Sequence, residues 1–140
     1  MGFKVPIRVY IEDTDAGGIV FYGNYLKFFE RARTEYLRAA GIEQSETMTF
    51  NLCFVVRKAE IEYHRPARLD DLLWVSCDVE TQTPTRVVFS QSARLQSDDS
   101  LCVSARVEVV SVRLDTLKPM AMPNEVRLRL NTVIETPHVE

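Results

Sequence analysis

Residues 12–24, EDTDAGGIVFYGN, gather three acidic residues and three glycines directly before a strong helical pattern. From residue 25 to 40, apolar side chains recur at steps of three and four, namely Tyr25, Phe29, Ala32, Tyr36 and Ala40. We expect Asn24 to be the N-cap of this helix and Gly41 to lie just after its last turn. The sequence therefore predicts a loop rich in carboxylates and glycines that leads into one long helix.

Strand patterns lie on both sides of this helix. A short strand is predicted before the acidic loop, from the alternating apolar residues Val5, Ile7, Val9 and Ile11. After the helix, runs rich in β-branched and aromatic residues predict four longer strands, over 54–63, 72–82, 85–96 and 101–114. Long strands joined by short turns favour a curved antiparallel sheet, whose apolar face one long helix can cover. We therefore expect an α+β fold in which the sheet wraps around the helix.

The chain has 140 residues and a mass of 16.1 kDa, which fits one domain over residues 1–140, with a core of about 5–130 and a loose tail from Asn131. Apolar residues make up 46% of the chain and charged residues 26%, as in ordinary globular proteins rather than disordered ones. One sheet and one helix leave a sheet face and two strand edges uncovered. We therefore expect a homo-oligomer, with a dimer as the smallest unit and a tetramer as the alternative.

Charge, hydropathy and cysteine content disfavour several classes of protein. A net charge of −3 disfavours nucleic acid as a partner, and there is no apolar run of the ~20 residues that a membrane span needs. Cys53, Cys77 and Cys102 are widely spaced and form no C-x-x-C motif, so we expect buried thiols and no metal site. His64 and His138 have no nucleophile beside them and are expected to be structural or exposed. Together these features favour the cytoplasm.

Asp15 is the candidate reactive group of the acidic loop. It follows the first strand and precedes the predicted N-cap by nine residues, so it can lie beside the helix N-terminus. Backbone N–H groups are unpaired at such an end, and they favour negative charge or polarise a carbonyl. Gly17 and Gly18 permit turns and close approach of a ligand to the backbone. Aspartate and glycine are also ordinary turn residues, so a purely structural loop is the alternative interpretation.

The order of motifs along the chain resembles a known enzyme family. YIEDTDAGGIVFY (residues 10–22), Tyr25 and FERARTE (29–35) are followed by FVVRK (54–58), Glu62-Tyr63 and PARLDD (66–71). This succession is similar to hot-dog-fold acyl-CoA thioesterases of the 4-hydroxybenzoyl-CoA thioesterase family, and most similar to their YbgC-like, Tol-Pal-associated branch. The resemblance extends over about residues 5–125. It implies a hot-dog fold and hydrolysis of an acyl-CoA thioester to coenzyme A and a carboxylic acid.

The resemblance also implies roles for Asp15 and Tyr22. The matching aspartate acts as nucleophile or general base in this family, and the chain around Tyr22 donates a backbone N–H to the thioester carbonyl. An ionised aspartate can attack the carbonyl to form a mixed anhydride or can orient a water molecule, and both routes stay open. Members of the YbgC branch often have histidine seven residues after the catalytic aspartate, whereas this chain has Tyr22, as benzoyl-type members do. We therefore expect Tyr22 to supply its N–H, a contact or a hydrogen bond rather than a proton.

The predicted substrate-binding residues fall into three groups. The loop supplies Gly17, Gly18 and Val20; the acyl pocket is expected to be lined by Phe21, Tyr25 and Phe54; and the phosphates of coenzyme A are expected to meet Arg57, Lys58 and Arg86. Each aromatic residue is also a plausible core residue, and each cation a plausible solvated charge. Glu30 and Arg33 are interpreted as a partly buried structural pair. The resemblance implies no metal or redox cofactor. Coenzyme A enters as part of the substrate.

Two alternative functions follow from the same sequence. A non-hydrolytic module could bind acyl-CoA or acyl carrier protein, and Tyr22 in place of histidine together with many charged residues motivates this alternative. Another hot-dog chemistry, hydration of enoyl thioesters, usually pairs its acid with a histidine, and the sequence shows no such local pair. An acyl carrier protein is also a possible acyl donor for the thioesterase.

Overall fold

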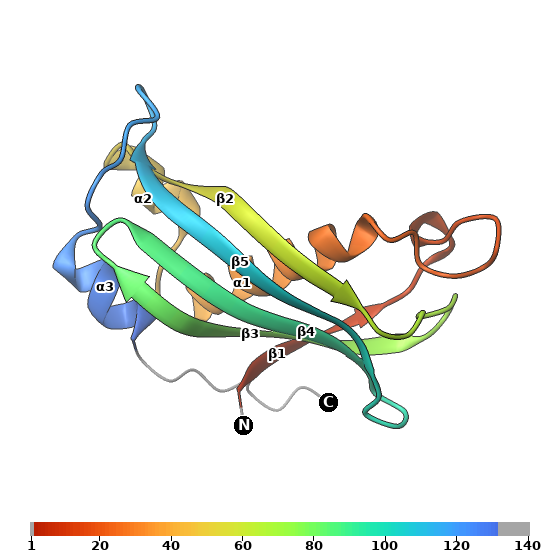
Figure 1. Ribbon diagram of the computed structural model, residues 1–140. Helices are drawn as coiled ribbons and strands as arrows, with labels where there is room; N and C mark the ends of the chain where they lie inside the picture. The colour runs from red at the N-terminus through yellow and green to blue at the C-terminus, as the bar shows by residue number, and fades with distance from the viewer. Residues whose placement is uncertain (1, 132–140) are drawn as a thin grey trace.

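The computed structural model describes residues 2–131, so His138 and the predicted loose tail beyond Asn131 lie outside the described residues. Within the described range, five strands, three α-helices and one short 3-10 helix follow in chain order (Figure 1). They are β1 (Phe3–Arg8), η1 (Ile11–Asp13), α1 (Asn24–Ala39), α2 (Gln44–Thr49), β2 (Leu52–Tyr63), β3 (Leu72–Thr83), β4 (Arg86–Leu95), β5 (Leu101–Arg113) and α3 (Asn124–Leu130).

All strand pairs are antiparallel, and the sheet has the order β1-β3-β4-β5-β2. The sheet curves along α1, which lies on one of its faces (Figure 1). Alternate residues of the central strands are buried against this helix, among them Val75, Phe89 and Val107, where they meet the fully buried Phe28 and Phe29. This arrangement is the predicted α+β fold and confirms the hot-dog architecture.

The long helix forms because its apolar side chains gather on one side. Tyr25, Phe29, Ala32 and Tyr36 are buried as predicted, and Phe28 joins them. The prediction for the end of the helix is also confirmed: Gly41 has φ +80°, and the N–H of Ile42 donates to the carbonyl of Leu37 at 2.8 Å. A side chain at Gly41 would be strained by this backbone conformation.

The prediction for the start of α1 was wrong. Gly23 precedes the helix, and Asn24 is its first residue. The Asn24 N–H donates to the Phe21 carbonyl at 2.8 Å, which continues the turn, while the Asn24 side-chain amide donates backwards to the Asp13 carbonyl at 2.8 Å. The side chain therefore ties the helix to the acidic loop instead of capping the first turn.

Other differences from the sequence prediction occur at the ends of elements. Strand β1 ends at Arg8, and Ile11 lies in η1 with 76% of its surface exposed, because the Asp13 carboxylate accepts the Tyr10 N–H at 2.8 Å and turns the chain. Cys77 and Cys102 are buried as predicted, but Cys53 near the start of edge strand β2 is only half-buried. The short helices α2 and α3 were not predicted.

Strand β2 contains a bulge at Arg57. The register against β5 pairs Val56 with Val109 and then Lys58 with Glu108, so Arg57 is an additional residue on β2. On one face of the sheet, β2 therefore presents even-numbered residues before the bulge and odd-numbered residues after it. Val56 and, beyond the bulge, Tyr63 both lie opposite buried residues of β5 and face α1.

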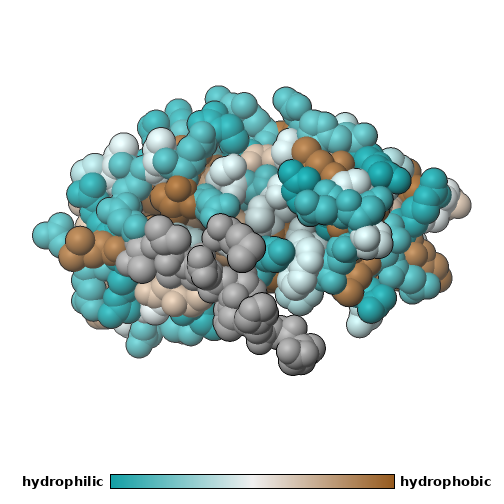
Figure 2. Space-filling view, turned by 90° about the horizontal axis from the view of Figure 1, so that it is seen from below, coloured by the Kyte–Doolittle hydropathy of each residue, from teal (hydrophilic) through white to brown (hydrophobic). Residues whose placement is uncertain are grey.

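Figure 2 shows the molecule from below, turned from the view of Figure 1. Hydrophilic side chains predominate on this face, and apolar side chains are divided into small separate patches. A more continuous exposed apolar stretch occurs on edge strand β2, where Val55 and Val56 are 39% and 48% exposed. The sheet edge is therefore one place where the fold leaves both backbone groups and apolar side chains open.

Candidate active site

The Asp15 loop is a tight hairpin closed by its own backbone. Thr14 pairs with Val20, and the Asp15 N–H donates to the Ile19 carbonyl at 2.9 Å. Inside the loop, the Asp15 carboxylate accepts the Gly17 N–H at 2.8 Å, while Gly18 has φ +77°. A residue with a side chain at Gly18 would be strained, so glycine is needed here for the turn. The Asp15 carboxylate is exposed and has a defined orientation.

The connection between β2 and β3 holds this loop in place. The Val20 N–H donates to the Ala67 carbonyl at 2.9 Å, and Ile19 pairs with Arg68. On the other side, the Leu69 N–H reaches the Gly18 carbonyl at 3.3 Å. The loop that carries Asp15 is therefore fixed to the sheet through the segment Ala67–Leu69, although the two segments are about fifty residues apart in the chain.

The backbone just before α1 presents an unpaired donor. The Phe21 N–H donates to the Asp13 carbonyl at 2.9 Å, and the Phe21 carbonyl accepts the Asn24 N–H at 2.8 Å. The N–H of Tyr22, between these bonds, donates to no acceptor within residues 2–131. Because the N-terminus of a helix carries partial positive charge, this N–H is suited to an oxygen that gains negative charge.

An open pocket of about 360 Å³ lies beside the Asp15 loop and the start of α1. We call it the tyrosine pocket; its lining residues are Ile19, Val20, Tyr22, Tyr25, Tyr63, His64, Arg65 and Pro66. The ring of Tyr63 makes edge contacts with the rings of Tyr22 and Tyr25, at centroid distances of 6.2 and 5.9 Å. The predicted residues Val20, Tyr22 and Tyr25 are thus brought together, whereas the exposed Phe21 packs against the Tyr22 ring at 4.8 Å.

Tyr25 is both a core residue and a pocket wall. Only 2% of its surface is exposed, and its hydroxyl oxygen accepts the Ala67 N–H at 3.3 Å. Burial raises the pKa of Tyr25 to about 12, so the phenol stays neutral at physiological pH. Tyr25 therefore supports the pocket and the Ala67 segment together and is unsuited to act as a base.

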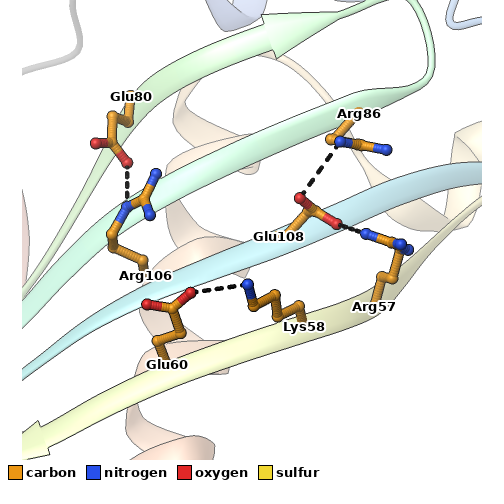
Figure 3. A network of polar contacts seen from close by, with 7 residues as sticks. All are labelled: Arg57, Lys58, Glu60, Glu80, Arg86, Arg106 and Glu108. Atoms are coloured by element: carbon orange, nitrogen blue, oxygen red, sulfur yellow. Dashed lines mark hydrogen bonds and ion pairs between the residues drawn. The ribbon is translucent and has the colours of Figure 1, made fainter.

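The predicted coenzyme A cations Arg57, Lys58 and Arg86 lie elsewhere. Figure 3 shows them on the sheet face opposite α1, in a group that we call the outer-face network: Arg57, Lys58, Glu60, Glu80, Arg86, Arg106 and Glu108. Arg57 and Arg86 both pair with Glu108, and Lys58 pairs with Glu60 at 3.0 Å. The hydrogen bond from Arg57 lowers the pKa of the Glu108 carboxyl. Within one chain, these cations do not approach the tyrosine pocket.

Phe54 is also separate from the tyrosine pocket. It lines a small cavity of about 80 Å³ between α1 and the sheet, together with Arg33. The predicted Glu30–Arg33 pair does not form in the described residues; instead Arg33 donates to the Gln91 side-chain oxygen at 2.9 Å, and burial lowers the pKa of the guanidinium. Gln91 in turn donates to the Phe29 carbonyl at 3.0 Å. Arg33 is thus held by a buried amide, while Glu30 is exposed.

Tyr63, His64 and Arg65 are pocket residues that the sequence analysis did not select. Tyr63 contributed only to the Glu62-Tyr63 motif of the family resemblance, and all three residues lie at the end of a strand, where the chain turns at Arg65-Pro66. The His64 ring nitrogen Nε2 lies 2.9 Å from the Ser104 hydroxyl, and the Arg65 guanidinium lies 3.7 Å from the Asp98 carboxylate. Their proximity to the Asp15 loop depends on the antiparallel pairing of β2 with β5, which sequence periodicity does not specify.

Within residues 2–131, no group of three or more histidine, cysteine, aspartate or glutamate side chains is arranged to hold a metal ion. In the same part of the chain, every helix is too short or too polar to cross a membrane.

Comparisons with known proteins agree with the architecture. A family model described as the thioesterase superfamily matches residues 17–102, beginning two residues after Asp15. The acyl-CoA thioesterase YbgC of Haemophilus influenzae is 45% identical over 127 residues, which cover 90% of this chain and 92% of that protein. The acyl-CoA thioester hydrolase YbgC of Escherichia coli O6:H1 is 43% identical over 124 residues, covering 89% and 92%. The crystal structure of a hypothetical protein from Aquifex aeolicus matches with a TM-score of 0.85 at 31% identity, covering 92% and 99%.

Proposed function

The chain belongs to the thioesterase superfamily, and we propose that it hydrolyses acyl-CoA thioesters by means of Asp15 and the Tyr22 backbone N–H. The prediction of an acyl-CoA thioesterase is confirmed at the level of the family and its named relatives. The observation that carries the assignment of residues is local: the loop that holds the oriented Asp15 carboxylate lines the tyrosine pocket through Ile19 and Val20, and the unpaired N–H belongs to Tyr22, which lines the same pocket. This pairing of a reactive group with a charge-stabilising donor is what acyl transfer requires.

The chemistry follows one of two routes. In the nucleophilic route, a carboxylate oxygen of Asp15 attacks the thioester carbonyl carbon, the C–S bond breaks, and the coenzyme A thiolate leaves behind a mixed anhydride that water then hydrolyses. In the general-base route, Asp15 takes a proton from water as the water attacks the same carbon, and the thiolate leaves from the tetrahedral intermediate. In both routes the carbonyl oxygen gains negative charge, which the Tyr22 N–H and the start of α1 stabilise.

The proposed contacts with the substrate fall into groups around the tyrosine pocket. Gly17, Gly18 and Val20 keep the loop narrow beside the thioester, and Tyr25 offers apolar surface to the acyl group; a contact of Phe21 with substrate stays a prediction, because Phe21 does not line this pocket. His64 and Arg65 at the pocket edge are suited to an anionic part of coenzyme A. A role for Arg57, Lys58 and Arg86 stays a prediction, as does a role for Phe54, because all four lie away from this pocket within one chain.

We further propose a homodimer formed through the free edge of β2. This strand has 12 residues, pairs on one side only, and exposes Val55 and Val56. Pairing two such edges satisfies their backbone groups and covers the apolar side chains. A tetramer, an acyl carrier protein as acyl donor and a cytoplasmic location stay predictions from the sequence.

The decisive experiment measures thiol release from short aliphatic, long aliphatic and aromatic acyl-CoA substrates. The Asp15→Asn protein should retain its unfolding midpoint and oligomeric mass but lose at least about a hundredfold in turnover, because the amide neither attacks nor accepts a proton. The exposed Asp78 on β3 offers a matched control, and Asp78→Asn should keep full turnover. Turnover that persists in Asp15→Asn contradicts the assignment of Asp15. Saturable acyl-CoA binding by the native protein without thiol release across the panel supports the binding module instead.

A further inference from the structure

Tyr63 makes a hydrogen bond that joins the sheet to the start of α1. Its hydroxyl donates to the Tyr22 carbonyl at 3.1 Å, across 41 positions of the sequence. Its ring also contacts the Tyr22 and Tyr25 rings edge-on. The bond is notable because Tyr22 itself is 65% exposed, so burial does not fix its position. A specific contact is therefore needed to hold Tyr22 in one orientation.

The hydrogen bonds around Tyr22 fix both of its neighbouring peptide groups. The peptide group that precedes the Tyr22 Cα includes the Phe21 carbonyl, which accepts the Asn24 N–H at 2.8 Å. The peptide group that follows includes the Tyr22 carbonyl, which accepts the Tyr63 hydroxyl. Because each peptide group is planar, fixing both leaves little rotation about the bonds of Tyr22. The direction of the unpaired Tyr22 N–H is thereby set from both sides.

Tyr63 is itself held firmly by the sheet. It is the last residue of β2 and pairs with the buried Val103 of β5. The next two N–H groups, of His64 and Arg65, both donate to the Cys102 carbonyl, at 2.8 and 3.1 Å. Tyr63 is 49% exposed; its phenol is protonated at neutral pH, and partial desolvation raises its pKa further, so the hydroxyl is available as a donor. The hydroxyl is therefore a donor at a defined place.

We propose that Tyr63 is a positioning residue for the thioesterase reaction, acting through the Tyr22 backbone. This inference rests on the proposed function. The Tyr63 hydroxyl aims the Tyr22 N–H at the place where negative charge develops on the thioester oxygen. Because that charge is largest in the transition state, loss of aim reduces kcat more than it weakens substrate binding. Tyr63 thus contributes to turnover without contacting the reacting atoms.

The test is Tyr63→Phe, which removes the hydroxyl and preserves the ring contacts. We expect kcat for an acyl-CoA substrate to fall about tenfold while KM stays within about twofold, since small errors of placement mainly affect the chemical step. The exposed Tyr10 provides a matched control outside the tyrosine pocket, and Tyr10→Phe should retain kcat. The unfolding midpoint in urea and the oligomeric mass of Tyr63→Phe should equal those of the native protein.

Three results overturn the proposal: an unchanged kcat, a rise in KM without a fall in kcat, or a fall in kcat that tracks a loss of folded protein. A second measurement needs no activity. In Tyr63→Phe, the amide resonances of Tyr22 and Gly23 should move while those of β4 stay in place, and unmoved Tyr22 and Gly23 resonances overturn the proposal. A native protein without thioester turnover contradicts the proposed function separately, since the resonance measurement still tests the hydrogen bond.

Discussion

The outer-face network and the tyrosine pocket are both rich in polar groups, but they use these groups in opposite ways. In the network, each carboxylate has a cation partner: Glu108 receives Arg57 and Arg86 from the neighbouring strands, and Glu80 of β3 receives Arg106 of β5 across β4. At the pocket, hydrogen bonds orient the chain, yet within residues 2–131 the Tyr22 N–H is left without an acceptor. An oriented but unsatisfied donor marks a site for chemistry more clearly than a concentration of charge.

The two regions also differ in how much a single polar interaction contributes to the stability of the protein. Exposed ion pairs contribute only about 0–1 kcal/mol each, because water already solvates both charges. A hydrogen bond to a buried group is costlier to lose, since its partner is then left unsatisfied away from water. The pocket should therefore be sensitive to changes of one atom, whereas the outer-face network should tolerate loss of a charge.

The largest expected difference concerns stability. Tyr25→Phe removes the oxygen that accepts the buried Ala67 N–H, so the free energy of unfolding should fall by about 1–3 kcal/mol. Glu108→Gln should change it much less, because water solvates the charges of its ion pairs. Urea denaturation at neutral pH measures both values. Equal losses would remove the contrast between the two regions.

A smaller effect is expected on KM, which should depend on the pocket cation Arg65 more than on the cations of the outer-face network. Arg65→Gln should raise KM for acyl-CoA about fivefold, the equivalent of about 1 kcal/mol, because a charge-assisted contact with phosphate is lost. KM for the corresponding acyl-N-acetylcysteamine thioester, which lacks the phosphates, should not change. Arg57→Gln tests the position predicted from the sequence, and Arg106→Gln serves as the outer-face control. If KM for acyl-CoA rises more in Arg57→Gln than in Arg65→Gln, the phosphate contact lies on the outer face instead of at the pocket.

The smallest expected effect concerns how the stability of the protein depends on pH. Tyr25 should contribute on the alkaline side and Glu108 on the acid side. Burial raises the pKa of Tyr25 to about 12, so the stability that it contributes is complete below pH of about 10 and is lost as the pH rises towards 12. The pKa of Glu108 is lowered, so its contribution is present above pH of about 4.3 and is lost as the pH falls further. Thermal melts should show a flatter alkaline limb in Tyr25→Phe and a flatter acid limb in Glu108→Gln. A flatter acid limb in Tyr25→Phe, or a flatter alkaline limb in Glu108→Gln, would contradict these assignments.

Much of the fold was predictable because local periodicity and burial agree. The helix from residue 24 to 39 presents its apolar side chains at helical spacing, and the four longer strands begin and end within two residues of prediction. The misplacements of Asn24 and Ile11 arose from hydrogen bonds with Asp13, which residue preferences do not reveal. The six-residue α2 has too few turns to display a period.

The site was predictable only where its residues are neighbours in the sequence. Asp15, Gly18 and Tyr22 belong to one short segment, so their association with the helix start could be inferred from order alone. Tyr63 and Arg65 join them through strand pairing, and no local pattern specifies that contact. Conversely, Arg57 was selected for its charge, but its side chain pairs on the opposite face of the sheet.

The bulge at Arg57 makes the site depend on the length of β2 as well as on its composition. The extra residue lets Val56 and Tyr63, seven positions apart, share the face toward α1; a regular strand that kept Arg57 in strict alternation would turn every side chain from Lys58 to Tyr63 to the other face. The Tyr63 hydroxyl would then leave the Tyr22 carbonyl, and Lys58 would point into the apolar core. The bulge, and not residue preference alone, thus decides which face Tyr63 presents; deleting Arg57 itself should leave Lys58 to Tyr63 on their present faces, because only the unpaired residue is lost.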